Sequence, residues 1–153
     1  MSLKRHARSR RGDSFFLEVV LQSVRLGERV LVAAPSNLAV DNLLDGLVRH
    51  GLRVARLGHP ARVHGDLREF SLDALVDRHP DTREARKLTK QARALFRKAG
   101  KWTRGKPEPG ARQADRAEAK QLLAGARALD EQVVASIIRD AQVVAATATG
   151  LDA

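Results

Sequence analysis

The chain has 153 residues, of which 43% are hydrophobic, and a formal net charge of +10. Its length predicts one domain with a sizeable core, and the absence of cysteine excludes disulfides and thiolate chemistry and fits a cytoplasmic protein. No apolar run reaches the roughly 18 residues of a membrane span, and the basic start lacks the apolar segment of a signal peptide.

The high positive charge predicts a polyanionic partner, above all nucleic acid. The alternative explanation of the charge is a surface that only keeps the protein in solution. Residues 1–13 predict a solvated basic arm that either touches phosphates or is simply disordered. A helix is predicted over residues 15–26, where Phe16, Val19, Val20 and Val24 have helical spacing, and Gly27 ends it.

A strand over residues 29–34 runs into a polar turn and then a helix. The strand is short, apolar and rich in Val, and Pro35-Ser36-Asn37 breaks it. The following helix, residues 37–50, has an apolar pattern and ends at Gly51; its recurring positions are Leu38, Val40, Leu43, Leu44, Leu47 and Val48. Ser36 or Asn37 can cap this helix, whose N–H groups suit a phosphate. Ligands of open α/β sheets bind at such turns.

Residues 53–57 predict a second strand, so the chain begins with the helix–strand–helix–strand order of a parallel sheet. A short helix over residues 71–76 is capped by Ser71 and interrupted by Pro80. Two long helices follow, from residue 81 and over residues 112–139, joined by the loop at residues 100–110 as an antiparallel hairpin.

Apolar stripes run along both long helices. In the first helix the stripe is Ala85, Leu88, Ala92, Leu95, Phe96 and Ala99. In the second helix it is Leu122, Ala126, Leu129, Val133 and Ile137, with Ala114 and Ala117 nearer the loop.

Basic residues concentrate between Arg83 and Lys106, where Glu84 is the one opposing charge. We expect that they cannot all lie on one helix face, so that some are simply solvated. Near the hairpin tip, the candidates for phosphate contact are Arg97, Lys98, Lys101 and Arg104. Trp102 either stacks on a base or is a packing anchor.

A third strand is predicted over residues 142–146, followed by Thr147-Ala148-Thr149-Gly150. Small hydroxyl residues and a glycine suit close backbone approach by a ligand, although an ordinary strand-end turn has the same composition.

Three segments resemble superfamily 1B helicases, in particular the group of the nonsense-mediated-decay helicase and the immunoglobulin mu-binding protein helicase. Residues 32–43, VAAPSNLAVDNL, resemble motif Ia, residues 56–62, RLGHPAR, resemble the segment after it, and residues 143–150, VVAATATG, resemble motif Ic. The resemblance covers about residues 14–153 in order and spacing.

The resemblance implies an α/β fold, namely a partial RecA-like parallel sheet at residues 14–65 and 140–153. A helical hairpin would be inserted at residues 66–139. It also implies that motifs Ia and Ic contact a single strand of DNA or RNA. The contact residues carried over are Pro35, Ser36, Asn37, Asn42, Thr147, Thr149 and Gly150. Asp41 has the wrong charge for a phosphate and is expected to support the turn.

The chain departs from the family at the nucleotide site. The family has a P-loop, Gly-x-x-x-x-Gly-Lys-Ser/Thr, directly before the first helix, but residues 5–14 lack Gly-Lys-Ser/Thr. The Asp-Glu motif and a second RecA-like domain do not follow before Ala153. We therefore expect no ATPase activity and no cofactor in this chain, whereas ATP and Mg²⁺ serve the parent family.

Three hypotheses follow. The first is a fragment of an ATP-dependent DNA/RNA helicase that keeps the nucleic-acid-contacting motifs. The second is a non-enzymatic basic module that binds nucleic acid. The third is a structural fragment that self-associates through exposed sheet edges. The histidines show no metal-ligand spacing, and no Ser/His/Asp set is suggested by local context.

Overall fold

The computed structural model describes residues 11–59, 63–101 and 110–150. The chain divides into two compact units, Met1–Leu75 with Ile137–Ala153, and Val76–Ser136. We refer to them as the sheet unit and the hairpin unit. The domain boundaries proposed from the sequence stay a prediction. None of the described helices is apolar enough over a sufficient length to cross a lipid bilayer.

Three parallel strands form the centre of the sheet unit. They are β1 (Val30–Ala34), β2 (Val54–Arg56) and β3 (Val143–Thr147), in the order β1-β3-β2. Val143 of β3 pairs with Val30 on one side and with Val54 on the other. The most C-terminal strand therefore lies between the two earlier ones. The α/β class with a parallel, RecA-like sheet is confirmed.

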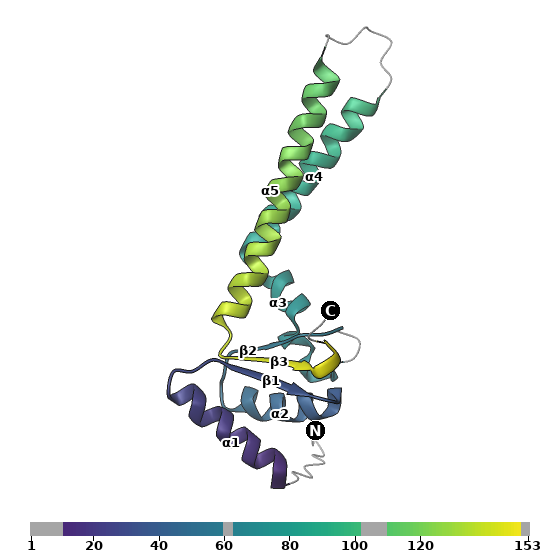
Figure 1. The fold of residues 1–153 in the computed structure, drawn as a ribbon. Helices are drawn as coiled ribbons and strands as arrows, with labels where there is room; N and C mark the ends of the chain where they lie inside the picture. Colours follow the sequence, from purple (N-terminus) through teal and green to yellow (C-terminus); the bar gives the residue numbers. More distant parts are fainter. Residues whose placement is uncertain (1–10, 60–62, 102–109, 151–153) are drawn as a thin grey trace, which may run out of the picture. The chain divides into compact units, whose positions relative to one another are not determined.

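Helices α1 (Arg11–Arg25) and α2 (Asn37–Arg49) lie on the same face of this sheet (Figure 1). The buried core between helices and sheet is apolar, and its members are Val20, Leu21, Val40, Leu44, Leu47, Val54, Val63, Leu67, Val143 and Ala145. Gly51 ends α2 as predicted, because its φ of 76° is a conformation that other residues rarely adopt.

The buried face of α1 agrees with the predicted one at Val20 and Val24 and differs at Phe16 and Val19. Phe16 and Val19 are exposed, and the residues that meet the core are Leu17, Val20, Leu21 and Val24. Leu38 of α2 is likewise exposed. Apolar residues stand at nearly every position from Phe15 to Leu21, so spacing alone does not select a face.

The described residues between β2 and β3 are mostly helical. They contain a short 3-10 helix, η2 (Gly65–Phe70), then α3 (Leu72–Arg78), α4 (Pro80–Gly100) and α5 (Ala111–Asp140). Ser71 caps α3, because its Oγ accepts a hydrogen bond from the backbone N–H of Ala74 at 3.3 Å. Pro80 is the first residue of α4, a position where its missing N–H costs nothing.

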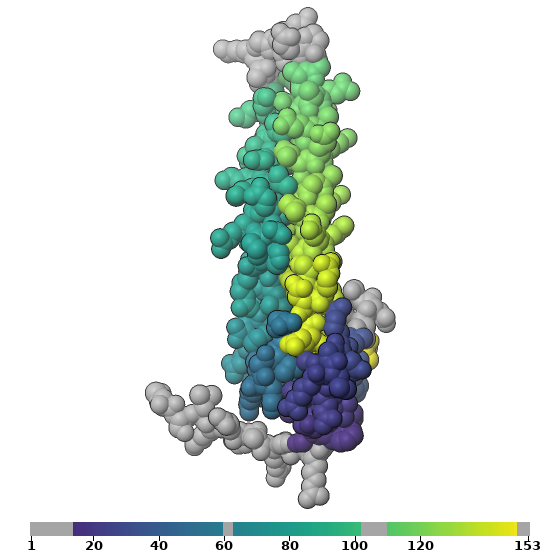
Figure 2. Space-filling model, turned by 90° about the vertical axis from the view of Figure 1, so that its left-hand side faces the viewer, coloured from purple at the N-terminus to yellow at the C-terminus, as the bar shows by residue number. Residues whose placement is uncertain are grey.

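Small residues pack the hairpin unit. The fully buried positions of α4 include Ala85, Ala92 and Ala99, and those of α5 are Ala119, Ala126 and Val133. Both sets repeat every seven residues, the period of a left-handed pair of helices. Figure 2 shows the two helices side by side along their length. The hairpin was predicted, but Ala114 and Ala117 are exposed, so their assignment to the apolar stripe was wrong.

Candidate nucleic-acid interface

The turn after β1 connects the end of a parallel strand to the start of α2. Ser36 has extended backbone angles and caps the helix, because its Oγ accepts a hydrogen bond from the N–H of Ala39 at 3.2 Å. Pro35 and Ser36 are exposed, and Asn42 is exposed one turn further along α2. The first N–H groups of a helix attract anions, so this turn has the local chemistry of a phosphate contact.

The turn after β3 lies beside it. The register pairs Ala34, the last residue of β1, with Thr147, the last residue of β3. Thr147 is half-buried, and Thr149 is exposed in the 3-10 helix η3 (Ala148–Gly150) that follows. We call residues 35–37 the β1 turn and residues 147–150 the β3 turn. The sheet therefore brings both predicted contact sets to one edge, where the parallel strands end.

A buried ion pair supports the β1 turn from inside. Arg56, the last residue of β2, is 1% exposed, and Asp41 of α2 is 6% exposed. Arg56 Nε donates to Asp41 Oδ1 at 3.1 Å, and the backbone N–H of His64 donates to Asp41 Oδ2 at 3.0 Å. Asp41 therefore supports the structure rather than facing a ligand, as the sequence predicted.

The same guanidinium holds Asn37. Arg56 Nη2 donates to Asn37 Oδ1 at 2.7 Å, and Arg56 Nη1 donates to the carbonyl oxygen of Leu57. The oxygen of the Asn37 side chain is thus used internally, whereas its amide nitrogen takes no part in this contact. Arg56 connects the end of β2 to the first residue of α2 and fixes the β1 turn.

Arg56 was not among the residues singled out from the sequence. One signal was present, because Asp41 lies one residue after Val40 and three before Leu44, two positions on the buried side of α2. A carboxylate on a buried face requires a cation or several donors. The sequence does not show which of the many arginines supplies that cation.

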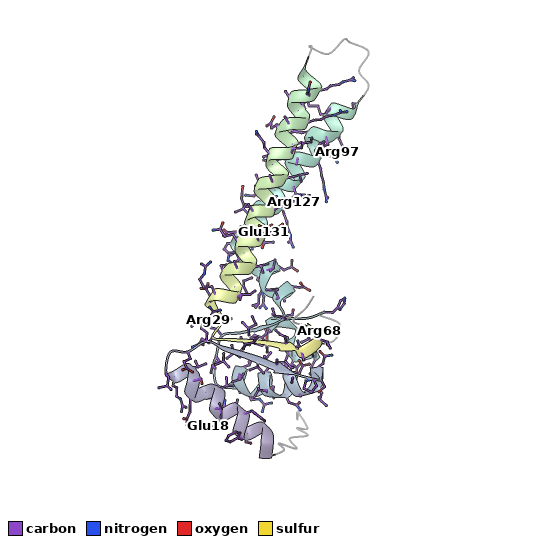
Figure 3. All side chains as sticks on the ribbon, in the orientation of Figure 1. Glu18, Arg29, Arg68, Arg97, Arg127 and Glu131 are labelled. Carbon is purple, nitrogen blue, oxygen red and sulfur yellow. The ribbon has the colours of Figure 1, made fainter. Side chains whose placement is uncertain are left out.

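The basic residues of α4 lie on one side of the helix. At 100° per residue, the seven basic residues from Arg83 to Lys98 fall within an arc of about 140°. All seven are exposed, and the arc lies opposite the buried alanines. The expectation that the ten basic residues from Arg83 to Lys106 do not all share one face stays a prediction, because Arg104 and Lys106 lie outside the described residues. Figure 3 shows the side chains of both helices, with Arg97 on α4 and Arg127 on α5 labelled.

Only some of the residues predicted to bind nucleic acid at the hairpin tip are among the described residues. Arg97 and Lys98 are exposed in the last turn of α4, and Lys98 Nζ lies 3.0 Å from Asp115 Oδ1. Lys101 is exposed and follows the helix end, where its carbonyl oxygen accepts a hydrogen bond from Arg112. Trp102 and Arg104 lie outside the described residues, so their predicted roles stay predictions.

A Ser–His–Asp group in the hairpin unit resembles a hydrolase triad but has the wrong hydrogen bonds. His79 Nδ1 accepts from the N–H of Asp81 at 3.3 Å, so the proton of the neutral ring is on Nε2. Nε2 lies 3.4 Å from Ser136 Oγ, and that hydroxyl donates to the carbonyl of Val133 at 2.9 Å. The imidazole therefore cannot take the serine proton, and the group serves as a helix cap.

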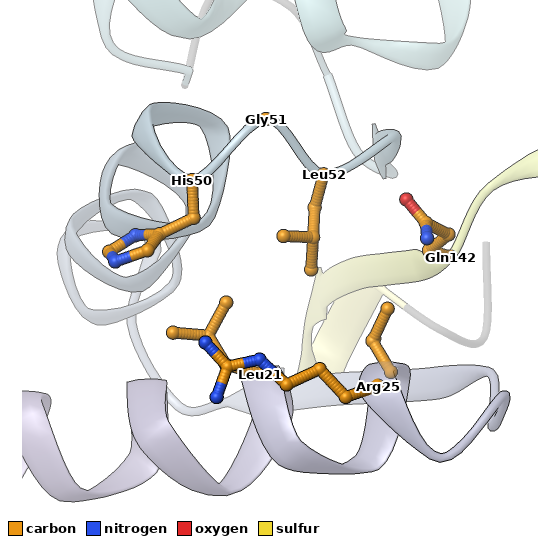
Figure 4. A pocket seen from close by; sticks show the side chains of 7 residues that line it. Leu21, Arg25, His50, Gly51, Leu52 and Gln142 are labelled. Atoms are coloured by element: carbon orange, nitrogen blue, oxygen red, sulfur yellow. The ribbon is translucent and has the colours of Figure 1, made fainter.

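A pocket of ≈ 340 Å³ lies at the opposite edge of the sheet, where β2 and β3 begin (Figure 4). Leu21 and Arg25 of α1 line it together with His50, Leu52 and Gln142. His50 Nδ1 is within 2.8 Å of the carbonyl oxygen of Gly46. Within the described part of the chain, no three His, Asp or Glu side chains converge as metal ligands. The candidate interface, formed by the β1 and β3 turns, lies at the other end of the strands.

A parallel sheet whose strands end in polar turns, one of them at a helix N-terminus, is the arrangement at which open α/β sheets bind ligands, and it is consistent with a partial RecA-like, P-loop NTPase-like fold. The sequence pattern of the AAA domain family matches residues 5–153. The chain belongs to this family. The match and the helicase relatives confirm the resemblance to superfamily 1 helicases.

The chain is similar to the DNA-binding protein SMUBP-2 of Mus musculus, with 37% identity over 134 residues. That alignment covers 88% of this chain and 13% of the mouse protein. An ATP-dependent helicase of Methanocaldococcus jannaschii is 38% identical over 98 residues, 58% of this chain and 15% of the relative. The DNA polymerase alpha-associated DNA helicase A of Schizosaccharomyces pombe is 46% identical over 59 residues, 39% of this chain and 9% of the relative.

Proposed function

We propose that this chain is the nucleic-acid-contacting part of the first RecA-like domain of an ATP-dependent superfamily 1B helicase. The β1 and β3 turns would bind the backbone of single-stranded DNA or RNA. The observation that supports the proposal is the pairing of Ala34 with Thr147, the last residues of β1 and β3, so that the β1 and β3 turns begin next to each other. The SMUBP-2 and helicase relatives support it.

The contacts are assigned by chemistry. The backbone N–H groups at the start of α2 and the hydroxyls of Thr147 and Thr149 donate to phosphate oxygens, and Asn42 donates through its side-chain amide. Such contacts fix the position of a strand without selecting its sequence. Arg56 keeps the β1 turn in its binding conformation without touching the ligand.

The residues at the family's nucleotide site do not fit ATP. No Gly-Lys-Ser/Thr precedes α1, so the chain offers no P-loop lysine for the β- and γ-phosphates and no P-loop hydroxyl for Mg²⁺. In the proposal, this chain therefore binds nucleic acid without hydrolysing ATP. Mg²⁺-dependent ATP turnover by the purified chain would contradict that part.

The test of the single-strand site is the variant Asn42→Asp, which adds a negative charge at nearly constant shape. At a distance of about 4 Å from a phosphate in water, this repulsion is about 1 kcal/mol, or about fivefold in affinity. Gln132→Glu, at an exposed position of α5, is the control with the same change in charge. Fluorescence anisotropy with a labelled single-stranded oligonucleotide should show the loss for Asn42→Asp only. Equal losses in both variants would contradict the assignment.

A second candidate function is self-association through β1, which is an outer strand of the sheet. Among the described strands, β1 pairs with β3 alone, and Leu31, the second residue of β1, is 60% exposed. Strands with an unpaired apolar edge tend to pair with another chain. Light scattering over a range of concentrations tests this candidate, and a monomer at every concentration would exclude it.

A further inference from the structure

We propose that the basic face of α4 is a second nucleic-acid surface, which binds the phosphate backbone of a double-stranded region. It is distinct from the single-strand site of the sheet unit, because it belongs to the hairpin unit and takes a ligand of another shape. We call it the α4 face and define it by its seven exposed basic residues, Arg83, Arg86, Lys87, Lys90, Arg93, Arg97 and Lys98.

Of the two long helices, α4 carries the net positive charge and α5 has none. The sequence of α4 contains seven basic and two acidic residues, whereas α5 contains five of each. Three members of the α4 face have acidic neighbours: Arg86 pairs with Asp77, Lys87 with Glu84, and Lys98 with Asp115. No ion pair within the described residues involves the other four, Arg83, Lys90, Arg93 and Arg97.

The cations without an acidic neighbour lie in a row. Arg83, Lys90 and Arg97 are seven residues apart, so each lies two turns, or about 10.5 Å, beyond the previous one on the same side of α4. From Arg83 to Arg97 the row is about 21 Å long, since an α-helix rises 1.5 Å per residue. That length corresponds to about six base pairs of a duplex at 3.4 Å per pair.

The α4 face has no group that would select a single strand. Proteins that bind single strands combine basic grooves with aromatic side chains on which bases stack. The one aromatic residue of α4 is Phe96, which is half-buried and lies outside the basic arc. A straight row of cations without a stacking platform complements the fixed phosphate rows of a duplex better than a flexible strand.

The test compares two double variants that change the net charge by the same amount. Lys90→Glu with Arg97→Glu alters the α4 face, and Arg116→Glu with Arg127→Glu alters exposed positions of α5. Each is titrated against a short blunt-ended DNA duplex and against one of its strands. We expect the α4 variant to lose about tenfold or more in duplex affinity and no more than about twofold in single-strand affinity. The α5 variant should lose no more than about twofold for both.

Neutral variants provide the second measurement. Lys90→Gln with Arg97→Gln should lower the salt dependence of duplex binding, the slope of log K against log salt, by about 0.9 for each lost contact. Arg116→Gln with Arg127→Gln should leave that slope unchanged. Far-UV circular dichroism shows that every variant is folded.

Several results would overturn the proposal. They are equal duplex losses in the α4 and α5 variants, an α4 loss that is the same for single strand and duplex, and a wild-type chain that does not bind the duplex. Failure of the single-strand proposal would give a different result. Asn42→Asp would then leave single-strand affinity unchanged, while the α4 variants would still weaken duplex binding.

Discussion

Replacing Arg56 by alanine should destabilise the sheet unit strongly. The substitution removes the partner of a carboxylate that is 6% exposed and leaves Asp41 with the backbone N–H of His64. It also removes the donors to Asn37 and to the carbonyl oxygen of Leu57. Removing one partner of a buried pair costs about 3–5 kcal/mol. Since a typical domain is stable by only about 5–15 kcal/mol, this loss is a large part of the total.

The assay is urea unfolding followed by circular dichroism, and the chain contains its own control. Arg49 pairs with Asp45 one turn away on α2, and their side chains are 59% and 48% exposed. Arg49→Ala should therefore cost only about 0.3–0.5 kcal/mol. If Arg56→Ala lowered the free energy of unfolding by no more than Arg49→Ala, the role given to the buried pair would be wrong.

A double variant distinguishes the loss of the ion pair from the cost of leaving one buried charge without a partner. Arg56→Met with Asp41→Leu removes both charges and leaves no unpaired ion in the core, so it should recover much of the loss caused by Arg56→Ala. Single-strand affinity should stay reduced in this variant, because Asn37 has lost its support from Arg56. Recovery of stability and affinity together would show that Arg56 acts on stability alone.

Three further substitutions test the fold. Ser36→Ala should cost about 1 kcal/mol of unfolding free energy through the lost cap of α2, and an unchanged value would contradict the cap. Gly125→Ala should raise stability by about 0.5–1 kcal/mol, because alanine has a higher helix propensity than glycine. The added methyl group fits, since it would meet Leu88 Cδ1 at an ordinary 3.7 Å; a lower melting temperature would refute that packing. Ala92→Leu should cost about 1–3 kcal/mol by overpacking the hairpin, whereas Ala94→Leu, at an exposed position, should change little.

The strand–turn–helix at residues 30–49 could be predicted because every local signal agrees there. The apolar run of β1, the break at Pro35 and the capping Ser36 each point to the same structure. That the β1 and β3 turns lie at the same side of the sheet also follows from the sequence, since parallel strands have their carboxyl ends on the same side. The order β1-β3-β2 does not follow, because strand pairing is decided by contacts far apart in the chain.

The predictions that failed depended on which face of a helix is buried. In α1, Phe16 and Leu17 are neighbours of similar hydrophobicity, and packing against α2 decides that Leu17 is the inner one. In α5, alanine occurs on all sides, so Ala117 and Ala119 cannot be told apart by composition. The partner of Asp41 required knowledge of β2, which is fifteen residues further along the chain.

The central claim is that the β1 and β3 turns form one surface for single-stranded nucleic acid. Amide chemical shifts of the isotopically labelled chain, followed by NMR during titration with a single-stranded oligonucleotide, test it most directly. We expect shift changes at Ser36, Asn42, Thr147 and Thr149 that share one dissociation constant, with Gln142 at the opposite edge unaffected. Changes confined to the opposite edge, or absent from either turn, would contradict it.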